Sequence, residues 1–367
     1  MAAFLTLVPP PRLLTATIWT AAVCLALVVR MPSAVAAEPD SSEDDAGAPV
    51  PGPALNYNMK LPTLGGRQFW GDVVHFRGWR IQQHVYSHHY RLLDPRDDRH
   101  AWGSREQCES ELERIKEERR LAPLTGRAVI LIHGIIRSSK SFARMQSELQ
   151  RAGYLTVPFD YPSTQIPIPE SAKYLREVIE SLKGVEQINF VVHSMGGLIV
   201  RSHLQQAGEE VDPRLHRMVM LGVPNLGARI ANIVQTNPVF RTVFGPAGQQ
   251  LIEADNGLIA SLPTPQFEFA VVAGARGTPD GYNPLIPGDD DGVVTVSSAC
   301  LPGAVDSLLV ECIHSFLPSN DTVITSALRF LDTGFLRPES RREPVIATAP
   351  QGGTASDQQT VDPPVAR

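Results

Sequence analysis

The chain has 367 residues, of which 43% are hydrophobic and 20% are charged, so it can bury one large core or two small ones. It carries 39 acidic and 33 basic residues, for a formal net charge of -6, and an acidic chain without a basic run argues against a nucleic-acid binder. Its four cysteines exclude a scaffold built on disulfides.

Residues 1–37 have the organisation of an export signal. Arg12 precedes an uncharged run over residues 13–29, and small residues follow it. A positive start, an apolar segment and an Ala-x-Ala site are typical of a secretory signal peptide, with cleavage expected after Ala36 or the next residue. An uncleaved membrane anchor is the alternative, because a run of that length can just span a bilayer and Arg30 follows it directly. On either interpretation we expect an exported protein that is secreted, periplasmic or held at the outer side of the inner membrane.

Two further segments, residues 38–55 and 336–367, are rich in Pro, Gly, Ser, Thr, Gln or acids and poor in large apolar side chains. Segments of this composition cannot bury enough apolar surface to become ordered. We therefore predict a disordered linker and a disordered tail. The folded part is then a single domain over residues 56–335.

Residues 56–124 are expected to form an N-terminal extension of that domain, packed on its sheet. Residues 80–93 alternate and are rich in aromatic side chains, which predicts one or two antiparallel strands. Ser104 with Gln107 forms a capping box. Apolar residues then recur at helical spacing among many charges, which predicts a surface helix over residues 105–120.

From residue 127 onward, short apolar runs alternate with helical patterns. Strands are expected over residues 128–132, 155–159, 188–192, 218–221 and 267–272, and helices over 141–152, 171–182, 196–206 and 321–331. This alternation predicts an α/β fold with a mostly parallel central sheet and helices on both faces. Ligands bind such sheets at the carboxyl ends of the strands, so chemistry is expected in the residues that follow each strand.

The strand-to-helix turn over residues 193–197, His-Ser-Met-Gly-Gly, carries the strongest chemical signal. It matches the nucleophile elbow G-x-S-x-G, in which a strained turn lifts Ser194 above the sheet. His193 and Gly196 support the turn, and Gly196 is the small residue that the close passage of strand and helix requires. Val192 departs from the pattern at its first position. The alternative is an ordinary buried serine in a turn.

The strand that ends at Ile132 leads into His133-Gly134-Ile135. Acyl transfer needs two N–H donors aimed at the position where the oxyanion forms. We expect one donor from Met195, directly after the serine, and the other from Ile135, with Gly134 permitting the turn. His133 is expected to orient this loop rather than to carry a proton.

A serine hydroxyl needs a base, and enzymes with this elbow place serine, acid and histidine in that chain order. His314 is the only histidine after the acidic run at residues 289–291, so we expect it to be the base. Asp291 directly precedes a glycine and two valines, and we expect it to fix the imidazole tautomer and stabilise the imidazolium. Asp289 and Asp290 are the alternatives. The run lacks the alternating spacing of a calcium loop, so no metal is expected there.

Cys300 and Cys312 flank the segment between the acid and the base. In an oxidising compartment, a disulfide between them would close a short loop and hold the acid and base loops together. Sequence does not show the required geometry, so a disulfide and two free thiols both stay open. Cys108 lies on the apolar face of its helix and is expected to be a buried free thiol.

Together these motifs resemble the α/β-hydrolase fold, and within it the bacterial secreted lipases and esterases and an inositol-deacylase-like group. The resemblance covers residues 125–335 and includes Val-Pro-Asn-Leu-Gly at 223–227, which is similar to the Thr-Pro-His-x-Gly loop near the nucleophile of that group. It implies that carboxylic esters of lipid-like or other hydrophobic substrates are hydrolysed through an acyl-enzyme, with contact to a membrane surface and without a cofactor. It implies no nucleic-acid partner, and the oligomeric state is not readable from the sequence.

The stretch over residues 224–265 is longer than a crossover helix requires and could be a lid or an acyl pocket over Ser194. The alternative is one crossover helix with a long loop. Two other functions remain open, an acyltransferase or amide hydrolase with the same three residues, and a non-catalytic interaction protein on the same fold. The apolar residues of the stretch are Ile230, Ile233, Val234, Val239, Phe240, Val243 and Phe244.

Overall fold

The computed structural model describes residues 66–234, 236, 238–252 and 257–346. The predicted export signal and linker lie outside the described residues, as does the tail beyond residue 346. No helix within the described ranges is long and apolar enough to cross a membrane.

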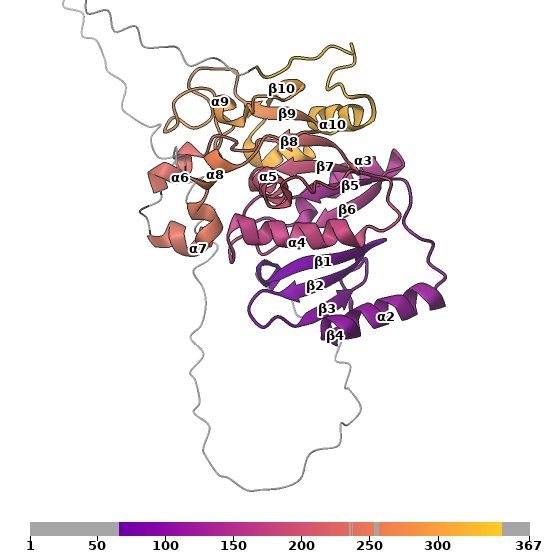
Figure 1. The fold of residues 1–367 in the computed structure, drawn as a ribbon. Coiled ribbons are helices and arrows are strands. Elements are labelled where there is room, and N and C mark those ends of the chain that lie inside the picture. The colour runs from indigo at the N-terminus through magenta and orange to yellow at the C-terminus, as the bar shows by residue number, and fades with distance from the viewer. Residues whose placement is uncertain (1–65, 235, 237, 253–256, 347–367) are drawn as a thin grey trace, which may run out of the picture. The chain divides into compact units, whose positions relative to one another are not determined.

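A six-stranded sheet, with all strands parallel, forms the centre of the described chain. Its strand order is β10-β9-β8-β7-β5-β6 (Figure 1). The inner strands are nearly continuous apolar runs, because both of their faces are covered. The strands are β5 (Arg127–Ile132), β6 (Leu155–Phe159), β7 (Gln187–His193), β8 (Leu215–Leu221), β9 (Glu268–Ala275) and β10 (Asp306–Glu311).

Five of these strands confirm the predicted ones, and β10 was not expected from the sequence. Asp306 and Val310 are its two buried residues, and Leu309 is 57% exposed. A strand at the edge of a sheet is covered less than an inner one, so its sequence lacks the apolar run that marked the others.

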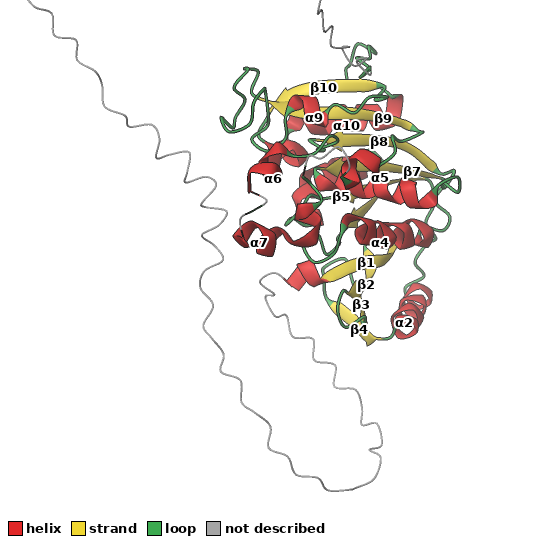
Figure 2. Cartoon of the chain, turned by 60° about the vertical axis from the view of Figure 1, so that its left-hand side comes forward, coloured by secondary structure: helices red, strands yellow, loops and turns green. Residues whose placement is uncertain are grey.

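Helices cover both faces of the parallel sheet, as predicted (Figures 1 and 2). The pleat sends alternate side chains to opposite faces, and β5 shows this. Ile130 and Ile132 lie in the core on the side of α4 and α5, whereas Val129 and Leu131 lie in the core on the side of α3 and α10. The helices are α3 (Ala143–Arg151), α4 (Ile168–Ser181), α5 (Met195–Ala207) and α10 (Asp321–Thr333).

The N-terminal extension is a four-stranded antiparallel sheet of its own, in the order β1-β2-β3-β4, rather than one or two strands. It packs through β1 on helix α4 (Figure 1), and Asp72 on β1 exchanges hydrogen bonds with the backbone of Asp160, directly after β6. The contact is close at Gly71, where an added Cβ would lie 2.5 Å from the ring of Tyr174. Its elements are η1 (Gly66–Phe69), β1 (Trp70–Phe76), β2 (Trp79–His84), β3 (Tyr90–Leu93) and β4 (Arg99–Gly103).

Helix α2 (Arg105–Glu118) follows this sheet, and the predicted capping box is confirmed. The Ser104 side chain accepts from the N–H of Gln107, and the Gln107 side chain accepts from the N–H of Ser104. Cys108 is buried on the inner face of the helix as a free thiol.

In the described residues between β8 and β9 the chain forms three helices, so the interpretation as one crossover helix was wrong. They are α6 (Arg229–Val234), α7 (Pro238–Gln249) and α8 (Leu258–Ser261). Helix α7 is kinked at Gly245, which has φ 60° and precedes Pro246. Shorter elements elsewhere are η2 (Ser139–Phe142), α9 (Val296–Ala299) and η3 (His314–Ser319).

The described chain continues past residue 335, where the tail was expected to begin. Leu336 is fully buried, and its N–H donates to Asp306 Oδ2 at 2.8 Å. Arg337 forms an ion pair with Asp306 at 3.0 Å. Residues 336–346 are therefore held on β10 by the buried carboxylate of Asp306. The composition of this segment does not indicate such a contact.

Candidate active site

Ser194 occupies a strained turn between β7 and α5. Its φ is 54° and its ψ is -128°, a conformation that costs energy for a residue with a Cβ and is found mainly at functional sites. The turn is held from both sides, because the Ser194 N–H donates to the carbonyl of Leu221 at 3.0 Å and the Gly197 N–H donates to the carbonyl of Ser194 at 3.1 Å.

Gly196 is required by a close approach of α5 to β5. A Cβ at this position would lie 2.5 Å from the carbonyl oxygen of Ile132 and 2.9 Å from that of His133. Val192, which departs from the elbow pattern, is fully buried in the core on the side of α4 and α5. The larger side chain is therefore accommodated at this position by the packing of β7.

Asp291 and His314 form a buried acid–imidazole pair. His314 Nδ1 donates to Asp291 Oδ2 at 2.7 Å, and the His314 N–H donates to the Asp291 carbonyl at 2.8 Å. The other carboxylate oxygen accepts the N–H groups of Val293 at 3.0 Å and Val294 at 2.7 Å. With Nδ1 as the donor, the imidazole presents Nε2 as a proton acceptor.

The two neighbouring acids, which the sequence left as alternatives, bind other parts of the loop. Asp289 accepts the N–H groups of Arg276 and Gly277 at 2.9 and 3.0 Å. Asp290 is fully buried and accepts the N–H of Asn283 at 3.1 Å; burial raises the pKa of its carboxyl. Both shape the segment before Asp291.

The residue next to the serine connects the elbow to the base. His193 Nε2 donates to the carbonyl of His314 at 3.0 Å, and the two rings lie 4.6 Å apart. Burial lowers the pKa of His193 well below its ordinary value, so its ring is neutral and can donate from one nitrogen only. A Cβ at Gly222 would lie 3.0 Å from Asp291 Oδ2 and 3.1 Å from His314 Nδ1, so all these residues meet at the carboxyl ends of β7 to β10.

The loop after β5 lies against the serine. A Cβ at Gly134 would lie 2.9 Å from Ser194 Cβ and 3.4 Å from its Oγ. Ile135 is the next residue of this loop, and Met195 directly follows the serine. The structure thus places the loop that carries Ile135 against the Ser194 elbow, and His193 links that elbow to His314 of the acid–imidazole pair. Their catalytic roles remain predictions.

His133 is tied to its own loop. Its Nδ1 donates to the carbonyl of Gly134 at 2.7 Å, and its ring stacks on Tyr161 at 4.4 Å. The Tyr161 hydroxyl donates to the carbonyl of His133 at 2.7 Å. These contacts are those of a residue that orients a loop.

No role was predicted for Arg201, which lies on α5 after Ser194 and is 4% exposed. Its guanidinium donates to the carbonyls of Leu262 at 2.6 Å, Pro263 at 3.0 Å and Asn225 at 3.2 Å. Burial lowers its pKa to about 10. Arg201 thus binds both ends of the stretch that carries α6 to α8. Its only sequence signal is a charged residue inside an apolar helix.

That stretch also contacts the loop after β5. A Cβ at Gly248, on α7, would lie 3.7 Å from Ile135 Cδ1. The Gln250 side chain accepts the N–H of Ile168, the first residue of α4, at 2.7 Å. Among its apolar residues, Val243 and Phe244 are partly buried, and the other five side chains lie outside the described residues. The lid role of the stretch stays a prediction.

Cys300 and Cys312 are both free thiols in the structure. The disulfide that the sequence left open is therefore not formed. Burial raises the pKa of both thiols, so neither is activated as a thiolate.

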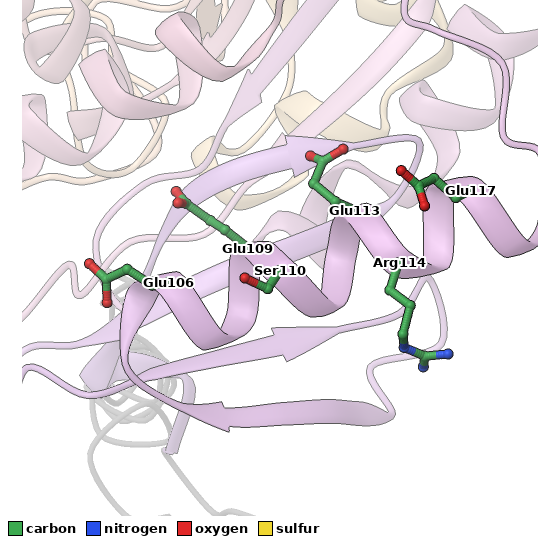
Figure 3. A pocket seen from close by; sticks show the side chains of 6 residues that line it. All are labelled: Glu106, Glu109, Ser110, Glu113, Arg114 and Glu117. Atoms are coloured by element: carbon green, nitrogen blue, oxygen red, sulfur yellow. The ribbon is translucent and has the colours of Figure 1, made fainter.

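Two described hollows lie away from Ser194. One, of about 690 Å³, lies between the β1–β2 hairpin and the α3–β6 segment. The other, of about 500 Å³, runs along α2. Glu106, Glu109, Glu113 and Glu117 line it (Figure 3). On the same helix, Arg114 pairs with Glu111 and Glu118. This is the solvated face of a surface helix, as predicted.

Comparisons with known proteins give weak likenesses. Residues 90–248 match the family model described as a domain of unknown function (DUF7379). No curated protein matches the chain. The solved structure of the lin2722 gene product from Listeria innocua is 18% identical, with a TM-score of 0.41, and the match covers 60% of this chain and 97% of that one.

Two further solved structures are similar to this chain at the same level. The lipase BlEst2 from Bacillus licheniformis, in its propeptide form, is 19% identical with a TM-score of 0.44, and the match covers 60% of this chain and 52% of that one. An extracellular alpha/beta-hydrolase from a Paenibacillus species is 16% identical with a TM-score of 0.36, with 57% and 98% covered. The strand order, the flanking helices and the elbow after β7 are those of an α/β-hydrolase fold.

Proposed function

We propose that this protein is a serine hydrolase that cleaves carboxylic esters of lipid-like or other hydrophobic substrates through an acyl-enzyme. The observation that carries the proposal is the strained Ser194 elbow beside the buried Asp291–His314 pair. A serine held in an unfavourable backbone conformation, next to an imidazole whose tautomer is fixed by a carboxylate, is the arrangement that activates a hydroxyl nucleophile.

The proposed reaction has two halves. His314 Nε2 accepts the proton of Ser194 Oγ as the oxygen attacks the ester carbonyl carbon, and the N–H groups of Ile135 and Met195 stabilise the oxyanion. The C–O bond to the alcohol breaks, and the alcohol leaves with the proton from His314. Water then attacks the acyl-enzyme by the same route and releases the acid, so no cofactor is needed.

The preference for hydrophobic esters is supported by apolar side chains on the loops that carry the proposed residues. These side chains are between 45% and 66% exposed, and large exposed apolar side chains that gather on one side of a protein mark a contact surface. They support a lipid substrate and contact with a membrane surface. They are Ile136, Leu226, Leu285, Ile313 and Phe316.

The test is turnover of nitrophenyl esters of increasing acyl length by the native protein and by Ser194→Ala. We expect turnover that is lost in Ser194→Ala and retained in Ser202→Ala, which removes a buried hydroxyl from the same helix. Equal rates for the native and Ser194→Ala proteins would contradict the mechanism. A preference for short acyl chains would contradict a lipid-like substrate but would still agree with an esterase activity.

A further inference from the structure

The N-terminal sheet and the η1 turn before it have no part in the proposed reaction, yet they contact the loop that carries a proposed oxyanion donor. Gln68 Nε2 donates to the carbonyl of Arg137 at 3.2 Å, and Gln68 Oε1 accepts the hydroxyl hydrogen of Ser163 at 2.8 Å. Ser163 Oγ accepts the N–H of Ile136 at 3.1 Å. Gln68 and Ser163 therefore close a ring of hydrogen bonds around the peptide group that joins Ile136 and Arg137, from the N–H of Ile136 on one side to the carbonyl of Arg137 on the other.

This peptide needs external support. Ile136 has φ 55°, and a β-branched side chain in the left-handed region is strained. Such a residue persists only where its surroundings hold it. Since Ile136 directly follows Ile135, the bonds that hold Ile136 also restrict the direction of the Ile135 N–H.

A second contact holds both ends of the same loop through Asp160. This carboxylate accepts the N–H of Ser139 at 2.7 Å and its hydroxyl at 3.0 Å, and lies 3.6 Å from His133 Nε2. Arg80, on β2, donates to Asp160 at 2.9 Å. Asp72, on β1, exchanges bonds with the Asp160 backbone at 2.9 and 2.7 Å. These groups are almost fully buried, so Arg80 supplies the positive charge that the two carboxylates need.

We propose that the N-terminal sheet positions the loop over residues 133–139 for catalysis, with Gln68 and Arg80 as its positioning residues. The inference rests on the proposed function, because the loop matters only if Ile135 stabilises an oxyanion. Both residues act through the loop. The oxyanion forms only in the transition state, so their loss should lower kcat and leave KM little changed. A misplacement of about 1 Å can reduce a rate by about 100-fold.

The test measures kcat and KM for nitrophenyl butyrate, together with the affinity for butaneboronic acid, whose serine adduct carries a negative tetrahedral centre. Gln68→Glu keeps the acceptor for Ser163 and removes the donor to Arg137, and Gln68→Ala removes both. Arg80→Met removes the buried cation, which Arg80→Lys retains. The matched control is Arg77→Met, because Arg77 lies on the same hairpin and donates to the carbonyls of Ala122 and Pro123.

We expect kcat to fall about 10-fold or more in Gln68→Ala and Arg80→Met, less in Gln68→Glu and Arg80→Lys, and hardly in Arg77→Met. KM should stay within about 3-fold, and boronic acid binding should weaken in step with kcat. If Arg80→Met fails to fold, the kcat values of the two Gln68 variants test the positioning role alone. Unchanged kcat and boronic acid affinity in these variants would overturn the positioning role while native turnover stands. A native protein without turnover that depends on Ser194 would instead overturn the proposed function.

Discussion

The substitution Asp291→Asn tests the acid–imidazole pair with almost no change in shape. In the native protein, Oδ1 accepts the N–H groups of Val293 and Val294, and Oδ2 accepts from His314 Nδ1. With an amide at this position, the two backbone donors retain the oxygen on their side. The amide NH₂ group then faces Nδ1 and donates to it.

This exchange selects the wrong histidine tautomer. Nδ1 becomes the acceptor and Nε2 carries the proton, so His314 cannot take the proton of Ser194. The loss of a correctly oriented base by this route costs about 10⁴-fold in kcat in a serine protease triad. We expect a fall of about 10³- to 10⁴-fold here, because in this pair too a buried carboxylate accepts from Nδ1 of the histidine.

The assay is kcat for nitrophenyl butyrate between pH 6 and 9, beside thermal unfolding. Asp290→Asn is the matched control, because Asp290 is equally buried and bonds only to its own loop in the described contacts. A loss of less than about 10-fold in Asp291→Asn, or an equal loss in both variants, would refute the assignment of Asp291.

Three further predictions concern packing and charge. Gly134→Ala places a Cβ 2.9 Å from Ser194 Cβ. We expect kcat for nitrophenyl butyrate to fall about 10-fold or more, with little change in the melting temperature. A fully active variant would contradict the close contact between Gly134 and Ser194. Arg201→Met leaves three carbonyls without their donor, and we expect urea denaturation to show that the free energy of unfolding falls by about 3 kcal/mol. An unchanged free energy of unfolding would contradict the view that Arg201 holds the two ends of this stretch. Burial raises the pKa of the Asp72 carboxyl from 3.8 to about 6, so the folded state binds this proton more tightly than the unfolded state. The free energy of unfolding should therefore fall by about 3 kcal/mol as pH rises from about 4 to 6. Urea denaturation should show this pH dependence in the native protein and not in Asp72→Asn, and the same pH dependence in both would contradict the prediction.

Local pattern was sufficient for much of the fold. The inner strands and the elbow at Ser194 were predictable because burial on both faces leaves continuous apolar runs, and because the close passage at Gly196 restricts residue type. The capping box at Ser104 was predictable for the same local reason. Strand β10 was missed because an edge strand keeps polar and exposed positions.

Contacts between distant parts of the chain were beyond local pattern. The sequence has three acids in a row, each of which binds backbone N–H groups, and Asp291 differs from its neighbours because its carboxylate accepts from His314 Nδ1. Gln68 and Arg80 lie more than sixty residues before their partners Arg137 and Asp160, so nothing in their own segments marks them. The ordered start of the tail depends in the same way on the buried carboxylate of Asp306.

The central claim is that Ser194 is an activated nucleophile, and covalent trapping tests it most directly. The native protein is treated with an alkyl fluorophosphonate and analysed by intact mass and by peptide mapping. We predict one adduct, located on Ser194, that is absent from Ser194→Ala and forms far more slowly in Asp291→Asn. An unmodified native protein, or an adduct on another residue at the native rate in Ser194→Ala, would contradict the claim.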